Sequence, residues 1–332
     1  MAGADLTAVS INLWLVKDGS PRDAIYDGHP LLRRLRGVGK HGRGTKVAKR
    51  IWRESEGGEF IQDAPRIAQS AASTKIRGME AVDASGHQPT KKAYWEWAMY
   101  GKIVSIPYYD SWRNEGPTAM ISDWQDRVTE AIDRMKYDVE ADIGAANTTG
   151  NSSWIGVNGL DGVVNETNTS PTTLGGLTRS SYTGWKNYAT DMSGALASNL
   201  DDLTTMYANI RTVTGKTVDL MLAPAAVWSY MHGYLQGKGE VQFQKDDLPD
   251  PGYPTFRWLG AEVAASQHIK AESLYLLATE CMWMQVHRKG NFALMPEQEG
   301  TQYFGKTRKL VFMGNWAAHR MNALGVVYDI TS

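Results

Sequence analysis

Histidine and cysteine are the residues that most often carry catalysis or bind metals, and their spacing here matches no catalytic pattern. The single cysteine, Cys281, and His287 would lie roughly 20 Å apart along an extended strand, beyond hydrogen-bond reach. None of the histidines has a zinc-protease spacing; they stand at positions 29, 41, 87, 232, 268, 287 and 319. The chain contains no G-x-S-x-G elbow and no Walker lysine loop. We therefore predict no catalytic, cofactor-binding or metal-binding residue, and no enzyme activity.

Carboxylates gather on one side of a segment that reads as a long helix, residues 119–147. Catalysis or metal binding would be one use for them, but no histidine joins them at i+3 or i+4, so a solvated acidic face is the prediction. These carboxylates are Asp123, Asp126, Glu130, Asp133, Asp138, Glu140 and Asp142. The other side carries an apolar stripe at helical spacing, made of Ile121, Trp124, Val128, Ile132, Met135, Val139 and Ile143. About 28 residues at 1.5 Å rise give a rod of roughly 40 Å, starting near Pro117 and stopping at Gly144 or Asn147.

Residues 31–53 form a basic run with nine Lys or Arg and no acidic residue. Such a run suits either contact with nucleic acid or pairing with acidic neighbours, and the residues leave both alternatives open. Gly37, Gly39 and Gly42 fit the spacing G-x-G-x-x-G. No hydrophobic strand precedes them, so a dinucleotide site is not predicted.

Two strand-like runs between Lys46 and Pro107 flank a polar middle, which predicts a protruding hairpin whose apolar face needs a neighbour. In the second run an apolar series alternates with a polar one at the period of a half-buried strand. The apolar series is Ala93, Trp95, Trp97, Met99 and Ile103.

Beyond Gly150 the pattern changes to alternating strands and helices. A helix capped at Ser198 or Asn199 is predicted to bury Leu200, Leu203, Met206, Tyr207 and Ile210. A strand at Val218–Ala223, a helix from Pro224 to Leu235 and a long loop at 236–254 follow. Further strands are predicted at Phe256–Ala265, Ser273–Ala278 and Met282–Arg288. The β-rich C-terminal run must pair with earlier strands.

The bulk properties describe an ordinary folded protein long enough for two modest cores, with 42% hydrophobic and 21% charged residues. A net charge of −1 argues against a chain that is mainly a nucleic-acid binder. Twelve Trp and fifteen Tyr suggest large contact surfaces in addition to core. No apolar run reaches the roughly 18 residues of a membrane span, and the N-terminus lacks a signal-peptide pattern. We expect a protein folded in a reducing cytoplasm, with no membrane partner and Cys281 as a buried small hydrophobe.

The order of these parts resembles the tailed-bacteriophage major capsid protein, whose fold is of the Hong Kong 97 type. The resemblance is carried by HPLLRRLRGVGK, by the long helix leading into WIGVNGLDGVV, by GGLTRSSYTGWKN, VDLMLAPAAVWSYMHGYLQ, GYPTFRWLGAEVAAS and MQVHRKGNFAL, and by the final GVVYDI. It implies an α+β chain with an N-terminal arm (1–45), an extended β-hairpin loop (46–106) and a spine helix in a peripheral domain (107–153). An axial domain (154–305) would follow, and C-terminal strands (306–332) would return to the peripheral domain.

The resemblance further implies a structural protein of the virion that self-assembles, as hexamers and pentamers, into an icosahedral shell around double-stranded DNA. Its expected partners are other copies of itself, the packaged DNA through non-specific contacts, separate scaffolding and portal proteins, and in some systems decoration proteins; assembly would occur in the host cytoplasm. No cofactor is expected. The candidate intersubunit contacts are Arg33, Arg34, Arg36, Arg50, Arg53, Trp52, Trp95, Trp97 and Tyr100.

Some relatives cross-link a lysine to an asparagine between subunits. Lys75, Lys91, Lys92 and Asn315 are the residues to consider here, but no local signal activates them, so non-covalent assembly is expected. The sequence leaves three alternatives to a phage capsid. They are a cellular nanocompartment shell of the same fold, a nucleic-acid-binding module using residues 31–53, and a carbohydrate-active protein with an aromatic cleft, for which no pair of facing carboxylates is found.

Overall fold

The structure is a computed structural model, and nine parts of the chain are described. They are residues 30–35, 51–67, 90–109, 117–147 (backbone alone for 117–125), 155–196, 199–238, 255–296, 298–299 and 304–331. Several predictions lie outside these residues: most of the N-terminal arm, the tip of the hairpin and the long loop, together with Arg36 and Arg50.

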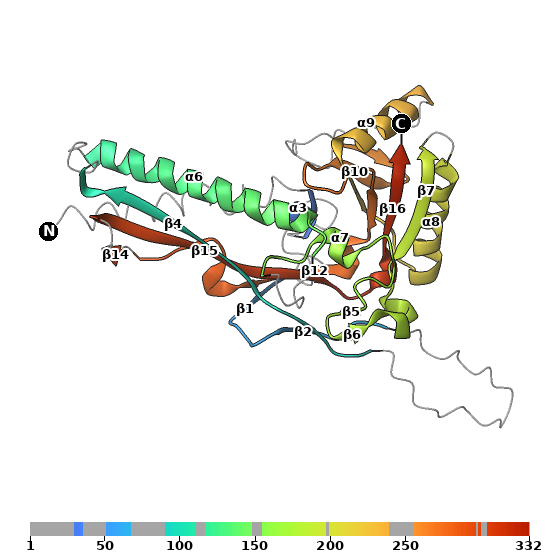
Figure 1. Cartoon of the computed structure of the whole chain (residues 1–332), viewed down its shortest axis with the longest axis horizontal. Helices are drawn as coiled ribbons and strands as arrows, with labels where there is room; N and C mark the ends of the chain where they lie inside the picture. The colour runs from blue at the N-terminus through green and yellow to red at the C-terminus, as the bar shows by residue number, and fades with distance from the viewer. Residues whose placement is uncertain are drawn as a thin grey trace, which may run out of the picture.

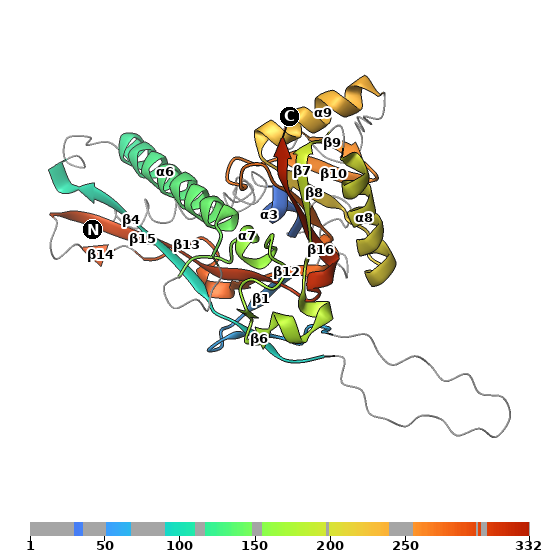
Figure 2. The ribbon, with the colours of Figure 1, turned by 45° about the vertical axis from the view of Figure 1, so that its right-hand side comes forward.

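A rod projects from one side of a wider body (Figure 1). The rod consists of α6 (Pro117–Gly144), β4 (Ala98–Pro107) and the N-terminal part of β15 (Gly305–Ala318), which run side by side in both views (Figure 2). β4 and β15 pair antiparallel from Gly305 opposite Pro107 to Gly314 opposite Ala98. The rod is therefore built from segments some 200 residues apart in sequence, which are held in one register by backbone hydrogen bonds.

β15 is the central strand of a six-stranded sheet that continues from the rod into the body. Its other partners are β12 (Met282–His287), β13 (Ala293–Leu294) and β14 (Gln298–Glu299), all antiparallel. β1 (Trp52–Ser55) adds to β12 in parallel. The prediction that the C-terminal run pairs with earlier strands is confirmed for β15.

The body is built on a second six-stranded sheet with the order β7-β16-β11-β8-β10-β9. Its strands are β7 (Tyr188–Ala195), β8 (Leu220–Ala223), β9 (Thr255–Trp258), β10 (Ala261–Ala265), β11 (Leu274–Leu277) and β16 (Leu324–Thr331). β16 lies between β7 and β11, so the last strand of the chain completes the sheet of the body rather than returning to the rod with β15. The division of the chain into five domains stays a prediction. Of the two C-terminal strands, β15 belongs to the sheet of the rod and β16 to the sheet of the body.

Each face of the body sheet is covered by different helices. On one face lie α8 (Leu200–Thr214) and α9 (Ala225–Gly237), whose buried side chains share a cluster with Met221, Val263 and Val327. The other face shares a second cluster with α3 (Pro30–Leu35), α7 (Leu160–Val163) and the sheet of the rod. Because alternate residues of a strand point to opposite faces, both faces of this sheet are apolar.

The helices form where the sequence pattern predicts them. α6 buries Val128, Ile132, Met135, Val139 and Ile143 of the predicted stripe. α8 buries Leu203, Met206 and Ile210 and ends at Gly215, whose φ of 67° is the left-handed conformation that a glycine C-cap favours. Pro224 precedes α9 as its N-cap residue, as predicted.

One expectation about strands is wrong in detail, and another can be followed only in the residues that the structure describes. The segment Phe256–Ala265 is a hairpin, β9 and β10, because Leu259 (φ 50°) and Gly260 (φ 78°) both take positive φ and reverse the chain. The predicted hairpin at 46–106 is seen as a short pair, β2 (Ile61–Asp63) with β3 (Ala93–Trp95), and a bridge from Arg66 to Thr90. The remaining strand pair, β5 (Thr173–Leu174) and β6 (Leu177–Thr178), forms a small antiparallel hairpin beside the β2–β3 pair.

Candidate assembly surface

The rod has one covered and one uncovered side. α6 packs along β4, and Val104 and Ile106 lie in the same buried cluster as Val128 and Ile132. Met99 and Ile103 alternate with these residues and therefore point to the other side, where each is 61% exposed. Directly across the ladder from Met99 lies Met313, on the same face of the sheet. We call Met99, Ile103 and Met313 the outer strip.

The outer strip corrects the sequence prediction, which placed Met99 and Ile103 on the buried side of the strand. The alternation holds through Ala93 and Trp95, which are buried. Glu96 and Trp97 then interrupt the strand between β3 and β4. In β4 the buried positions are Ala98, Val104 and Ile106, so the parity of the buried side has changed. Glu96 and Trp97 do not pair in the ladder, and hydrophobicity alone does not reveal such a break. The sequence pattern therefore assigned Met99 and Ile103 to the wrong face of the strand.

Aromatic side chains cluster at the free end of the rod. Tyr108 donates its backbone N–H to the carbonyl of Phe304 at 3.0 Å, and their ring centroids lie 4.9 Å apart in an edge-on arrangement. Phe304 is 73% exposed and Tyr109 is 71% exposed. We call Tyr108, Tyr109 and Phe304 the tip. Exposed aromatic rings supply large contact area at low entropic cost, which is why they are common in protein interfaces.

A polar junction fixes the rod to the body. The hydroxyl of Tyr100, on β4, donates to the carboxylate of Asp142, near the end of α6, and accepts the backbone N–H of Val157 at 2.8 Å. Burial, the hydrogen bond to Asp142 and its negative charge all raise the pKa of Tyr100, so the phenol stays protonated. Burial also raises the pKa of Asp142, while the hydrogen bond from Tyr100 opposes that rise.

A second set of hydrogen bonds lies beside this junction. The backbone N–H of Asn158 donates to Oδ1 of Asn315 at 2.9 Å, and its Nδ2 donates to the carbonyl of Trp316 at 2.6 Å. Nδ2 of Asn315 donates to the carbonyl of Glu96 at 2.9 Å. Asn315 is 1% exposed. Its side chain is therefore engaged inside the chain and is not accessible to a lysine of a neighbouring molecule in this structure.

The start of the basic run is buried in the body. Arg34 forms an ion pair with Glu262 on β10, and the two side chains are 7% and 3% exposed. Arg33 is buried as well, and Leu31, Leu32 and Leu35 fill the core beside them. Buried guanidinium groups are out of reach of a nucleic acid, so these two arginines do not support a nucleic-acid-binding face.

Arg53, at the other end of the basic run, belongs to a cluster at the base of the extended loop. Its guanidinium lies over the ring of Trp283 at 4.4 Å and is 3.1 Å from Nε2 of His319. The carboxylate of Asp63 forms an ion pair with Arg53 and is in contact with Nδ1 of His319. The cluster ties β1, β2 and the end of β15 together.

The aromatic candidates differ in how much they leave exposed. Trp95 is buried against Trp185, with ring centroids 6.3 Å apart. Trp97 is half-buried and donates Nε1–H to the carbonyl of Gly58 at 2.9 Å, and Trp52 and Tyr100 are also half-buried. That the nine candidate residues contact a neighbouring subunit stays a prediction. The sequence pattern did not reveal the outer strip or the tip. For the tip, the sequence signal was a Phe and a Tyr next to the ends of predicted strands.

The described residues contain no constellation suited to catalysis. Among them no group of three or more His, Cys, Asp or Glu is placed to hold a metal ion. Burial raises the pKa of Cys281 to about 11, so its thiol is protonated and unreactive at neutral pH. Across the same residues, no helix has both the length and the apolar character needed to span a membrane.

Comparisons with known proteins identify the fold. No protein-family model and no curated protein sequence matches the chain. The structure is similar to the capsid of cyanophage A-1(L), with a TM-score of 0.58 at 14% identity over 84% of this chain and 90% of that one. It is also similar to the capsid of a native GTA particle, with a TM-score of 0.56 at 9% identity over 89% and 93% of the two chains.

A third similar structure is the SrpI encapsulin of Synechococcus elongatus PCC 7942, with a TM-score of 0.51 at 13% identity over 84% of this chain and 85% of that one. Each of the three similarities covers more than four-fifths of the chain. Together with the spine helix, the paired long strands and the mixed body sheet, they show that this chain has the α+β fold of the Hong Kong 97-type capsid proteins.

Proposed function

We propose that this chain is the major capsid protein of a tailed phage, a structural subunit that assembles with its own copies into an icosahedral shell around double-stranded DNA. The observation that carries the proposal is the rod of this capsid fold, which exposes Met99 and Ile103 of the outer strip and Tyr109 and Phe304 of the tip. An isolated globular protein would gain free energy by covering such apolar side chains, at about 25 cal/mol for each Å² removed from water. Neighbouring copies in a shell would supply that cover.

The proposal includes hexamers and pentamers as the units of the shell, with scaffolding and portal proteins as assembly partners and the virion as the place of the mature protein. The role is structural, which agrees with a chain whose described residues offer no activated nucleophile. Contacts with packaged DNA would be non-specific, because phosphate contacts do not read sequence.

Substitution at Ile103 tests the role of the outer strip. We expect Ile103→Glu to fold but to lose assembly, because burying a carboxylate at an apolar contact costs free energy even with Lys309 opposite it across the ladder. The matched control is Ile103→Val, which keeps the position apolar and should assemble. Size-exclusion chromatography with light scattering reports assembly, and circular dichroism reports folding. Normal shells from a folded Ile103→Glu variant would contradict the role of this strip.

A cellular nanocompartment shell is the second candidate, and the similarity to the Synechococcus encapsulin favours it. The contents of the particle separate the two functions. Nuclease-protected DNA inside particles isolated from their source identifies a phage capsid, whereas a co-purifying cargo protein without DNA identifies a nanocompartment.

A further inference from the structure

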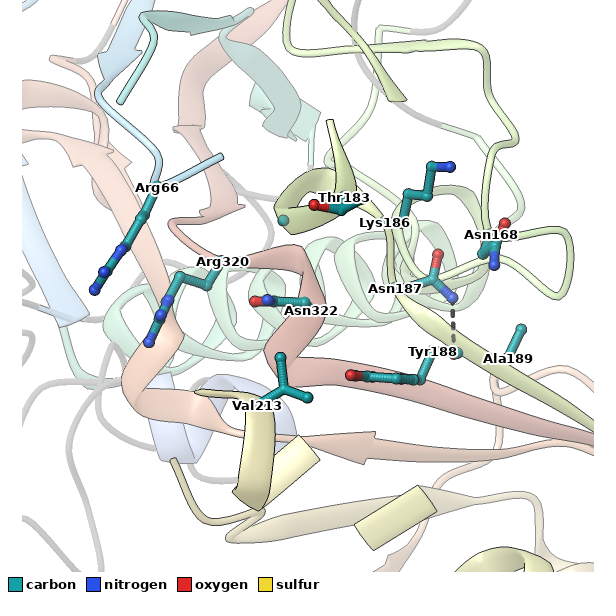
Figure 3. A pocket seen from close by; sticks show the side chains of 11 residues that line it. Arg66, Asn168, Thr183, Lys186, Asn187, Tyr188, Ala189, Val213, Arg320 and Asn322 are labelled. Carbon is teal, nitrogen blue, oxygen red and sulfur yellow. Dashed lines mark hydrogen bonds between the residues drawn. The ribbon is translucent and has the colours of Figure 1, made fainter. Parts of the chain in front are cut away.

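A pocket of about 400 Å³ lies where the base of the extended loop, the segment 168–189 and the turn before β16 meet (Figure 3). Arg66 and Arg320 lie on one side of it, Lys186 on the other, and Asn322 between them. None of the described residues that line the pocket is acidic. Three cationic side chains around one concave surface create a positive potential that favours an anion.

The wall beside Lys186 is fixed by hydrogen bonds that use the whole side-chain amide of Asn187. Its Nδ2 donates to the carbonyls of Asn165 at 2.8 Å and Tyr188 at 2.9 Å. Its Oδ1 accepts from the guanidinium of Arg179, which is fully buried behind the wall. The shape of the pocket is therefore set before any ligand arrives, which lowers the entropic cost of binding.

Two cations of the pocket, Arg320 and Lys186, keep donors for a ligand. Arg320 uses one N–H to hold the carbonyl of Thr214 at 2.9 Å, and a guanidinium has five such donors. Lys186 is half-buried, and the described residues provide no carboxylate paired with it. Arginine and lysine together are the side chains that bind phosphate groups through charge-assisted hydrogen bonds.

One polar atom of the pocket points to a second feature of the ligand. The hydroxyl of Thr183 lines the same space and can either donate or accept.

We propose that this pocket binds a small phosphorylated molecule that also carries a hydroxyl group, such as a sugar phosphate or a nucleotide. The volume lies within the range of about 300–1,000 Å³ that small-molecule sites occupy. A nucleic-acid duplex presents its phosphates on a convex surface, which a closed concave wall does not accommodate. The proposal concerns a ligand site and is independent of whether the chain assembles into a shell.

Calorimetric titration of the full-length protein, in whatever assembly state it is purified, tests the site. The probes are inorganic phosphate, ribose 5-phosphate and a short DNA duplex. We expect ribose 5-phosphate to bind more tightly than inorganic phosphate, because its hydroxyl groups can form a hydrogen bond with the hydroxyl of Thr183. Lys186→Gln and Arg320→Gln should each weaken binding about 10-fold or more, since a charge-assisted hydrogen bond is lost. Lys289→Gln, which removes an exposed cation outside the pocket, is the matched control and should bind normally.

Three results would overturn the proposal: no binding of either small phosphate at millimolar concentration, equal binding by Lys186→Gln and the unmodified protein, or binding that is lost equally in Lys289→Gln. Binding of the DNA duplex alone, abolished by Lys186→Gln, would assign the site to nucleic acid and contradict a small ligand. Circular dichroism of each variant confirms that the fold is retained.

Discussion

The hydroxyl of Tyr100 donates a hydrogen bond to the carboxylate of Asp142, and this contact joins the first strand of the rod to the end of its spine helix. The same hydroxyl accepts the N–H of Val157, the point where the chain begins its path through the body. One side chain therefore connects β4, α6 and the body.

Tyr100→Phe should reduce the free energy of unfolding by about 1–3 kcal/mol, since it leaves a part-buried carboxylate and a backbone N–H without their partner. Urea denaturation followed by tryptophan fluorescence measures the change. Tyr207→Phe is the control, because its hydroxyl donates to the carbonyl of Leu259 at an exposed position and water can replace it. Equal losses of free energy of unfolding in the two variants would show that the hydrogen bonds of Tyr100 contribute no more to stability than the exposed hydrogen bond of Tyr207.

The Arg34–Glu262 pair anchors the start of the chain in the body, and breaking it should be costly. Removing one partner, as in Arg34→Met or Glu262→Met, leaves the other charge buried without its partner and should destabilise the fold by about 3–5 kcal/mol. The double variant Arg34→Met/Glu262→Met should recover much of that loss, because no charge remains buried. Additive losses in this double-mutant cycle would show that the two side chains do not interact.

Gly144 ends α6 where the helix meets the loop that contains His268. A Cβ at Gly144 would lie 1.7 Å from the carbonyl oxygen of His268, so Gly144→Ala requires the backbone of the loop to move. We expect a loss of at least 2 kcal/mol in stability, comparable to other overpacking substitutions at about 1–3 kcal/mol. Gly233→Ala in α9 is the control: a Cβ there meets nothing within 4 Å, and alanine should stabilise the helix by about 0.4–1 kcal/mol. Thermal melts of both variants measure these changes in stability. A Gly144→Ala variant as stable as the unmodified protein would contradict the close contact between Gly144 and the backbone of His268.

The stability of the chain should fall with rising pH through the titration of Glu140. Burial raises the pKa of this carboxyl above its ordinary value of 4.5, while Lys136 opposes the rise. The folded protein therefore holds the proton to higher pH than the unfolded chain, and the free energy of unfolding decreases between the ordinary and the raised pKa. Glu140→Gln removes this loss, so it should stabilise the protein at pH 7 more than at pH 4.

Chemical denaturation at both pH values measures the Glu140 effect, with Glu130→Gln at an exposed position of the same helix as the control. The prediction would be contradicted if Glu140→Gln changed the free energy of unfolding equally at pH 4 and pH 7. Destabilisation at pH 7 alone would contradict it as well, because the carboxylate would then stabilise the folded protein.

Local patterns in the sequence predict the helices well, because an apolar stripe at helical spacing and a glycine or proline at the boundary are sufficient signals. α6, α8 and α9 follow such stripes. The side of β4 that is buried did not follow from the pattern, since two residues outside the ladder changed the parity. The Arg34–Glu262 pair spans 228 residues, and the pocket gathers residues from four separate parts of the chain, so neither has a local signal. The resemblance to capsid proteins supplied the topology that local patterns lack.

Electron microscopy of the purified full-length protein tests the central claim most directly. The account predicts closed icosahedral shells, or the hexamers and pentamers from which they are built, with the rods of neighbouring copies in contact through the outer strip. A well-folded protein that stays strictly monomeric under conditions that favour assembly would contradict it.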